Sequence, residues 1–206
     1  MAQIELPGPD TDGQTSVERA IASRESRRAF AESPVGMEDV AQLLWAVQGI
    51  THRTDGVQMR AAPSAGATYP LTTFLEVAPG GCEDLEQGVY QYDPIGHALD
   101  VSGTAPVHEE LTRAAGDQEV IAEAPTTIVL TGNYDRTRRQ YPEHGDRYVH
   151  MEAGHAAENV HLVCELRDLN SCPVGAFADA EVAEVLDLPD RLDPLYLLPF
   201  GKPLPA

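Results

Sequence analysis

Lysine is almost missing from this chain of 206 residues, because Lys202 is its one lysine and arginine supplies the other permanent cations. Lysine and arginine total 14 against 33 aspartates and glutamates, which leaves a formal net charge of −19. Phosphate backbones and anionic lipids repel such a chain, so neither nucleic acid nor a membrane is expected as a partner. Salt screens the repulsion among the protein's own charges. We therefore expect a halophilic host, with an acidic protein from an ordinary host as the alternative.

Cysteine is scarce as well. The chain has three cysteines, which is an odd number, and none of them stands in CxxC spacing: Cys82, Cys164 and Cys172. This pattern predicts free thiols in a reducing compartment rather than disulfides or a zinc site. The first residues lack the positive and apolar regions of a secretion signal. No apolar run approaches the ~20 residues of a membrane helix. These absences predict a soluble, cytoplasmic protein.

Several familiar site motifs are also absent. Without GxGxxG or GxxxxGK[ST], neither a Rossmann site nor a P-loop is predicted, and the GxSxG elbow of many hydrolases is missing. Two ExxH motifs, Glu152 to His155 and Glu158 to His161, suggest di-iron ligands, but a di-iron site needs such motifs on two facing helices. Here they are six residues apart on one predicted helix, about 240° around its axis. We expect polar groups on the helix surface or at a subunit interface, and no metal.

Apolar periodicity and turn residues predict a loose arm over residues 1–14 and a single domain over residues 15–206. Helical spacing predicts helices over Val17–Glu25, Met37–Gln48, Val107–Ala115, Glu119–Glu123, Arg147–Leu169 and Asp179–Leu186. Short β-rich runs predict strands over Phe74–Ala78, Val89–Tyr92, Thr126–Thr131 and Leu195–Leu198. Helices around a mostly antiparallel sheet make the expected fold class α+β.

The segment from Arg60 to Pro70 is not explained by apolar periodicity. Pro63 disfavours the α region for the residue before it, so the chain should arrive extended. Ser64 is then a candidate N-cap, and the small residues Ala65 and Gly66 would leave first-turn amides uncovered. Uncovered amides suit the close approach of a flat or anionic ligand. By itself, the segment also fits an ordinary helix start.

A second candidate site is the arginine cluster around Ser26. A helix capped by Ser16 should end near Arg24 and Arg28, whose planar forks of donors suit a phosphate group. The alternative is a solvated helix end, where cations are favoured by the helix dipole. Lys202 could add a third cation to the site or belong to a frayed tail.

At these residues the chain resembles the nitroreductase-like family of FMN-dependent oxidoreductases, over nearly its whole length. Each matching motif is weak alone, but six follow one another in the family's order. They are Arg24-x-Ser26-x-Arg28, Arg60-x-x-Pro63-Ser64-Ala65-Gly66, Gly88-Val89-Tyr90-x-Tyr92, Arg147-Tyr148-x-x-x-Glu152-Ala153-Gly154-His155-x-x-x-Asn159, Pro173-Val174-Gly175-Ala176-Phe177 and Leu198-Pro199-Phe200-Gly201. The residues in these motifs look most like those of the branch of azoline-oxidising (thiazole- and oxazole-forming) dehydrogenases. That branch often has Lys-Tyr before the long helix, where this chain reads Gln140-Tyr141.

The resemblance implies non-covalently bound FMN at the interface of a homodimer. It assigns a phosphate anchor, a segment along the isoalloxazine ring and backbone amides facing the N5 side. The implied phosphate anchor consists of Arg24, Ser26, Arg28 and Lys202. The implied ring segment consists of Arg60, Pro63, Ser64, Ala65 and Gly66. The amides that would face N5 belong to Gly175 and Ala176. Tyr141 and Tyr148 are candidate proton donors. Small residues on the long helix would permit close approach of a partner or packing on the sheet: Ala153, Gly154, Ala156 and Ala157.

The activity that the resemblance implies is hydride transfer by a ping-pong cycle, from NADH or NADPH to a nitroaromatic or quinone acceptor. Two alternatives remain open. One is azoline oxidation during peptide maturation, and the other is a flavin-binding carrier or sensor without turnover. Steady-state oxidation of a nicotinamide separates the enzyme from the carrier.

The charge balance predicts that stability rises with salt. The −19 charge repels itself over a Debye length of about 30 Å at 0.01 M salt, against about 3 Å at 1 M. The melting temperature, measured by calorimetry, should therefore rise with sodium chloride, and sucrose of equal osmolality should not reproduce the whole rise. A flat or falling curve would refute the halophile inference.

Overall fold

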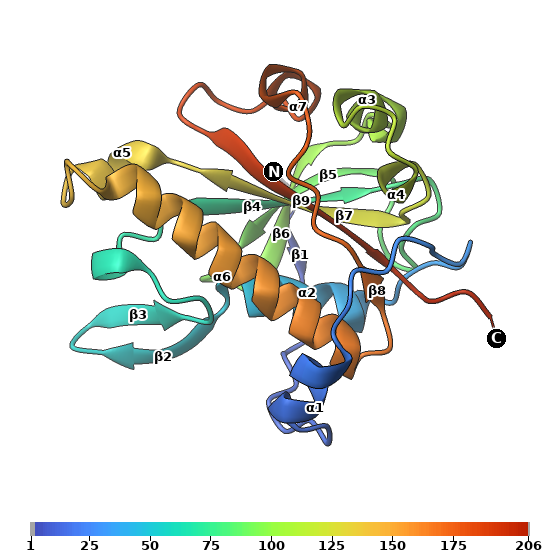
Figure 1. Ribbon diagram of the computed structural model, residues 1–206, viewed down its shortest axis with the longest axis horizontal. Coiled ribbons are helices and arrows are strands. Elements are labelled where there is room, and N and C mark those ends of the chain that lie inside the picture. The colour runs from blue at the N-terminus through green and yellow to red at the C-terminus, as the bar shows by residue number, and fades with distance from the viewer. Residues whose placement is uncertain (1–2, 206) are drawn as a thin grey trace.

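The computed structural model describes residues 3–205, which form an antiparallel sheet with helices packed on both faces (Figure 1). The seven strands lie in the spatial order β1 (Gln3–Glu5), β6 (Ala98–Gly103), β5 (Gly88–Asp93), β4 (Leu71–Val77), β7 (Thr126–Gly132), β9 (Asp193–Gly201) and β8 (Asn170–Ser171). Every neighbouring pair in this order is antiparallel. This arrangement confirms the predicted α+β fold.

Successive side chains of the central strands point to opposite faces of the sheet, so the interior has two hydrophobic cores. In β7, Ile128 and Leu130 contribute to one core and Val129 to the other, as expected for a strand buried on both faces. Two of the three buried threonines of this strand donate their hydroxyls to neighbouring backbone carbonyls. Thr126 Oγ1 donates to the carbonyl of Phe200 at 3.0 Å, and Thr131 Oγ1 donates to that of Thr72 at 2.9 Å.

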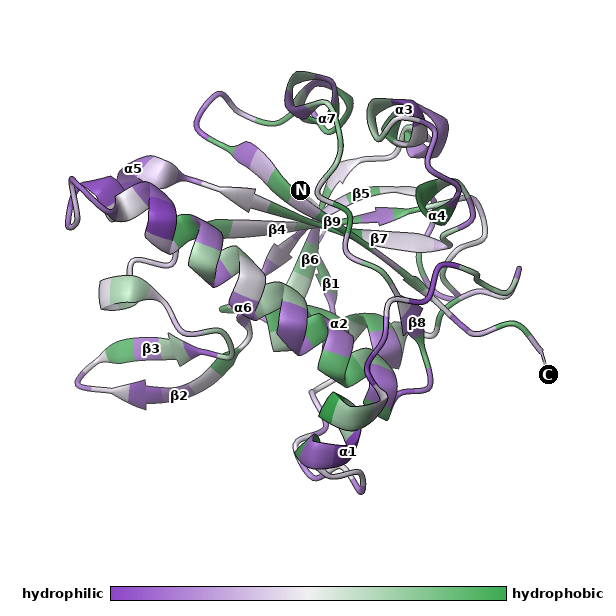
Figure 2. Cartoon of the chain, in the orientation of Figure 1, coloured by the Kyte–Doolittle hydropathy of each residue, from purple (hydrophilic) through white to green (hydrophobic). Residues whose placement is uncertain are grey.

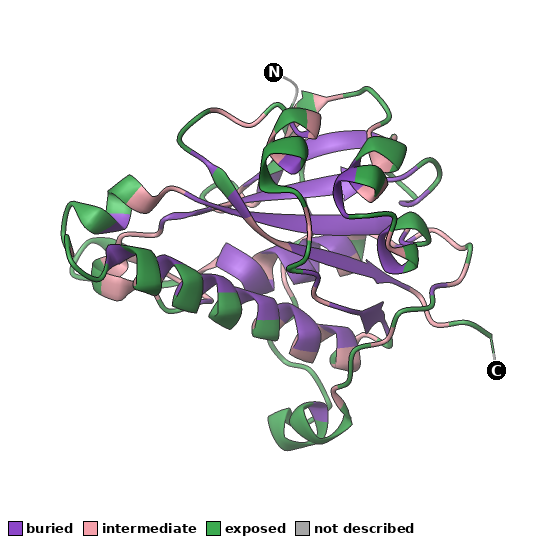
Figure 3. Ribbon diagram, turned by 45° about the horizontal axis from the view of Figure 1, so that its top comes forward, coloured by how far each residue is buried: buried purple, intermediate pink, exposed green. Residues whose placement is uncertain are grey.

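The helices are divided between these two cores. One core packs beneath α2 (Met37–Gln48) and α6 (Gly145–Leu166), and the other beneath α3 (His108–Ala114), α4 (Glu119–Ala122) and α7 (Asp179–Val185). The sheet-facing side of α6 is buried and its outer side is exposed (Figure 3). Hydrophobic residues concentrate along the central strands and α2, whereas α5 (Tyr134–Arg138) is hydrophilic (Figure 2).

All six predicted helices and four predicted strands are present, with ends shifted by at most three residues. Five features are additional to the prediction: β1, β6, β8, α5 and the hairpin of β2 (Ile50–Thr54) and β3 (Val57–Arg60). The hairpin turns at Asp55 and Gly56, whose φ values are 51° and 81°. This Asp-Gly pair was an available hairpin signal. Its flanks are polar, which hid the alternation.

The predicted loose arm is partly ordered. Within residues 1–14, Gln3–Glu5 form the edge strand β1, which pairs with β6. Residues 1 and 2 of the arm lie outside the described residues. The prediction failed here because a three-residue strand is too short to show alternation.

The three cysteines are buried free thiols, as predicted. Within residues 3–205, no helix is long and apolar enough to cross a bilayer.

Candidate functional site

The segment of Pro63, Ser64, Ala65 and Gly66, here called the PSAG loop, is a tight turn rather than the start of an α-helix. Only a 3-10 turn, η1 (Ala65–Ala67), forms, and Gly66 and Ala67 have left-handed φ values of 58° and 53°. The prediction of Ser64 as a side-chain N-cap is therefore wrong. Its Oγ instead accepts from the Tyr69 amide at 2.9 Å, which closes the loop on itself.

Polar side chains from three elements meet beneath the PSAG loop. At the end of β3, Arg60 Nη1 donates to Gln48 Oε1, and Gln48 lies at the last position of α2. Gln48 Nε2 donates to Glu152 Oε1 on α6 at 3.2 Å. The Ser64 side chain lies close enough to this carboxyl to lower its pKa. One buried carboxyl thus connects α2, α6 and the PSAG loop.

Glu152 was expected as a surface or interface group, and the structure corrects this. It is only 2% exposed, and His161 on the same helix is 4% exposed and bonded to Ser171 Oγ at 2.9 Å. His155 and Glu158 are exposed. The two ExxH motifs are therefore split between the core and the surface. Within residues 3–205, no cluster of three potential metal ligands occurs.

Burial changes the proton affinity of Glu152. Desolvation raises the pKa of its carboxyl to about 7, against the opposing hydrogen bonds from Ser64 and Gln48 and the charge of Arg60. Burial also lowers the pKa of Arg60, which lies over the Tyr69 ring with Cζ 4.5 Å from the ring centroid. The site beneath the loop therefore holds a carboxyl that titrates near neutral pH.

The two tyrosines proposed as proton donors lie beside the PSAG loop. The Gln140 side chain covers Gly66 so closely that a Cβ there would come within 2.5 Å of Nε2. The same Nε2 donates to Tyr141 Oη at 3.5 Å, and the Tyr141 and Tyr148 rings meet edge to face at 5.1 Å between centroids. A loop, a glutamine and two aromatic rings thus form one surface next to the N-terminal half of α6.

The expected phosphate anchor lies on an extended segment. Helix α1 (Val17–Ser23) ends before Arg24, so the predicted helix end at Glu25 is two residues too long. The segment then follows the edge of the sheet, where the Arg27 amide donates to the carbonyl of Ser171 at 3.0 Å. Further along, the Ala31 amide donates to the carbonyl of Lys202 at 2.9 Å. This pairing brings Lys202 to the same edge as the arginines.

The arginines on this segment differ in how they are paired. Arg27 forms ion pairs with Glu165 and Glu25, which assigns it to the structure of the edge. The candidate anchors have only long contacts. Arg24 Nε is 3.9 Å from Glu158 Oε1, Lys202 Nζ is 3.6 Å from Glu83 Oε1, and Arg28 Nη1 reaches the Ser26 carbonyl at 3.5 Å. Exposed pairs of this kind are weak. Their donors can therefore turn to an anion.

Gly175 and Ala176 lie on an exposed turn between two fixed points. The Val174 amide and carbonyl both pair with Leu197, and the Ala178 amide donates to the carbonyl of Ala114. Between them, the amides of Gly175 and Ala176 make no hydrogen bond within residues 3–205. Gln118 Nε2 holds the carbonyl of Ala176 at 2.7 Å. Sequence reasoning missed Gln118, because nothing local indicates a partner in a different loop.

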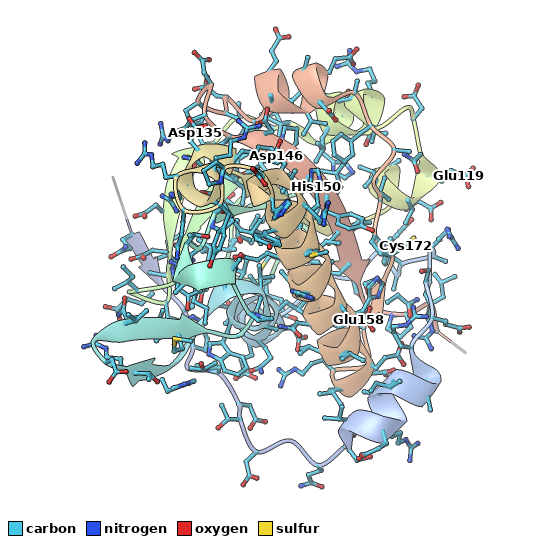
Figure 4. All side chains as sticks on the ribbon, turned by 60° about the vertical axis from the view of Figure 1, so that its left-hand side comes forward. Glu119, Asp135, Asp146, His150, Glu158 and Cys172 are labelled. Carbon is cyan, nitrogen blue, oxygen red and sulfur yellow. The ribbon has the colours of Figure 1, made fainter. Side chains whose placement is uncertain are left out.

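The structure does not bring all the predicted site residues together. The PSAG loop contacts α6 through Glu152, whereas Arg24 contacts it through Glu158, about 240° around the helix. In Figure 1, η1 lies between β3 and β4 on one side of α6, and the segment after α1 lies on the other. In Figure 4, Glu158 lies toward α1 and Asp146 at the opposite end of α6. In one chain, the predicted ring segment and the predicted phosphate anchor, here called the two half-sites, therefore lie apart on different sides of α6.

The raised pKa of Glu152 predicts how stability changes with pH. Because the folded state binds this proton more tightly, stability should fall as pH rises from the ordinary value of 4.5 to about 7. The loss should be roughly 3 kcal/mol. In urea titrations, Glu152→Gln should remove this dependence, and the exposed Glu143→Gln should keep it. A wild-type minus Glu152→Gln difference that stays constant between about pH 5 and 8 would contradict the assignment.

Comparison with known proteins agrees with the geometry. A family model described as the nitroreductase family matches residues 21–202. A protein of Methanocaldococcus jannaschii named as a nitroreductase is 37% identical over 199 residues, covering 97% of this chain and 96% of the relative. The microcin B17-processing protein McbC of Escherichia coli is 29% identical over 151 residues, covering 71% of this chain and 55% of McbC.

Solved structures also resemble this chain over nearly its whole length. A crystal structure from Ralstonia eutropha, also named as a nitroreductase, has a TM-score of 0.84 and 26% identity, and the match covers 99% of this chain and 90% of that one. The family match runs through every predicted site residue, from Arg24 to Lys202. Sequence, fold and the matched range therefore agree. This chain belongs to the nitroreductase family of oxidoreductases.

Proposed function

We propose that this protein binds FMN and transfers hydride from NADH or NADPH to a small organic acceptor of the nitroaromatic or quinone type. The observation that carries the proposal is the edge that joins Arg24, Arg28 and Lys202, whose donors have only long contacts. A dianionic phosphate matches three such cations. The free amides of Gly175 and Ala176 fit the rim of a flavin ring without adding bulk.

FMN, when bound, supplies the hydride acceptor and donor of a ping-pong cycle. The chain's own residues bind and orient it. Arg24, Ser26, Arg28 and Lys202 would hold the phosphate, and the Gly175 and Ala176 amides would face N5. The PSAG loop, positioned by Arg60, would cover the ring. Tyr141 or Tyr148 would donate a proton to the acceptor.

A homodimer would join the two half-sites. Ala153, Ala156 and Ala157 pack inside the chain, which supports the sheet-packing reading of these small residues. Gly154 is different, because it is exposed and a Cβ there would meet nothing within 4 Å. It lies on the outer stripe of α6 together with Met151 and His155. A partner seated on this stripe would bring its PSAG loop toward the phosphate anchor of the first chain.

Azoline oxidation is a second candidate, favoured by the similarity to McbC. The position before Tyr141 separates the two candidates. A lysine there could serve as a base, whereas the Gln140 amide carries no titratable group and instead covers Gly66. Thiazoline peptide and nitroaromatic substrates should therefore be compared directly. A carrier or sensor role would show flavin binding without turnover of either.

Removal of one phosphate contact should weaken flavin binding without unfolding the protein. Arg24→Ala or Arg28→Ala removes a charge-assisted contact, which costs about 1.5–3 kcal/mol, or roughly ten- to a hundredfold in affinity. Quenching of FMN fluorescence measures this affinity. Arg19→Ala, on the exposed side of α1, makes the same charge change and should leave the affinity unchanged. Unchanged affinity in both anchor variants would return these arginines to the solvated-surface alternative.

Bulk at Gly154 should separate the subunits and release the flavin together. A Cβ at this exposed position meets no atom within 4 Å, and glycine is a poor helix former, so the Gly154→Trp monomer should stay folded. Gly154→Ala is the control, because it removes the glycine without adding bulk. Light scattering and flavin absorbance should show a colourless monomer for the Trp variant alone. A Trp variant that remains dimeric and yellow would contradict a shared site at this stripe.

A further inference from the structure

A small polar cavity lies behind Arg60, beside the PSAG loop, and only this arginine is shared with the proposed flavin site. Its volume is about 140 Å³. Its walls come from β4, β5, α5 and the end of β3, and its polar lining includes Arg60, Arg136, Thr73 and Gln91. Pockets for cofactors of flavin size are several hundred Å³. This cavity therefore has room for a group of a few heavy atoms.

Two cations line the cavity without an acidic neighbour in its wall. Arg60 donates to the Gln48 amide and stacks on Tyr69, and Arg136 Nη1 donates to the Tyr69 carbonyl at 2.9 Å. Neither guanidinium forms an ion pair within residues 3–205. The cavity wall therefore carries two guanidinium groups without a carboxylate in direct contact, and the nearest acid in the network of Arg60 is Glu152, reached through Gln48.

Two residues that line the cavity each carry a buried donor without a partner. Arg60 Nε is buried and makes no hydrogen bond, and Thr73 Oγ1 is likewise unbonded in a residue only 3% exposed. A buried polar group without a partner costs about 1–3 kcal/mol, and more if it is charged. Water could satisfy the hydroxyl but would not neutralise the guanidinium. An oxyanion would satisfy both, because it offers several acceptor atoms and a negative charge.

We propose that this cavity binds a carboxylate-sized oxyanion between Arg60, Arg136 and Thr73. The anion would neutralise the charge shared by the two arginines and accept from the donors that now lack partners. Tyr69 connects the cavity to the PSAG loop, because its ring lies under Arg60 and its carbonyl binds Arg136. A bound anion would therefore hold the PSAG loop in place from the cavity side. The anion would be either a free ion or the acidic end of a substrate.

Calorimetric titration with sodium acetate, replacing sodium chloride at constant ionic strength, tests the site on the purified protein. We expect saturable binding of one acetate per chain in the wild type. Arg136→Gln should weaken it at least tenfold, and Arg139→Gln, an exposed arginine just after α5, should not. Because Arg136 is exposed on its outer side and makes a single hydrogen bond, the variant should stay folded. Thr73→Val, which removes only the hydroxyl, should weaken binding several-fold.

The absence of saturable heat in the wild type, or equal affinity in Arg136→Gln, would overturn the proposal. This outcome is independent of flavin, because the titration needs no turnover and a flavin-free preparation can be used. Steady-state kinetics distinguish a free ion from the acidic end of a substrate as the source of the anion. If a substrate provides it, acetate should compete with 4-nitrobenzoate and Arg136→Gln should raise the KM for 4-nitrobenzoate but not for nitrobenzene. If a free ion occupies the cavity, both KM values should respond alike.

Discussion

The buried carboxyl of Glu152 is the interaction on which the loop side of this protein depends. It accepts a hydrogen bond from Gln48 at the end of α2, which in turn holds Arg60 at the end of β3. It also lies beside the Ser64 side chain of the PSAG loop, which lowers the pKa of the carboxyl. Three residues at the end of this loop and just after it are left-handed, Gly66, Ala67 and Tyr69, and two of them are not glycine. Such backbone is costly unless its surroundings hold it, and this network together with Arg136 does so.

The same network explains why a flavin site in one chain would be incomplete. Glu152 fixes the PSAG loop on one side of α6, and the cations Arg24, Arg28 and Lys202 lie on the other side near its C-terminal end. The helix between them presents an exposed stripe with open space at Gly154. In our proposal, a second copy packs on that stripe and supplies the missing loop. The dimer would then be a requirement for cofactor binding rather than an addition to it.

Sequence reasoning recovered the parts whose signal is local. Strand β7 is a continuous β-rich run, as expected of a strand buried on both faces. Helices α2 and α6 carry apolar periodicity, because packing against the sheet fixes which side of each helix must be apolar. The Asp55-Gly56 hairpin had a local signal that polar flanks obscured. The three-residue strand β1 had none, since its pairing with β6 joins positions almost a hundred residues apart.

The errors at the candidate site have a common cause. Ser64 was read from its neighbours in sequence, but its partners are Tyr69 and Glu152, and the positive φ of Gly66 and Ala67 prevents the helix that it would cap. Glu152 was assigned to the helix surface or a subunit interface once the spacing of the ExxH motifs had excluded a metal site. The adjacent alanines at positions 153, 156 and 157 indicated the buried side of α6. Gln48 and Gln118 had no local signal, because the groups they bind lie 104 and 58 residues away.

Mixed dimers test the shared site most directly. Arg28→Ala would disable the phosphate half and Ala65→Trp the ring half, and each variant alone should bind flavin poorly. When the two chains are refolded together, a heterodimer contains one site built from two intact halves and one built from two defective halves. We predict that the purified heterodimer regains one wild-type flavin site. A heterodimer that binds flavin no better than either parent would contradict the account and place the whole site within a single chain.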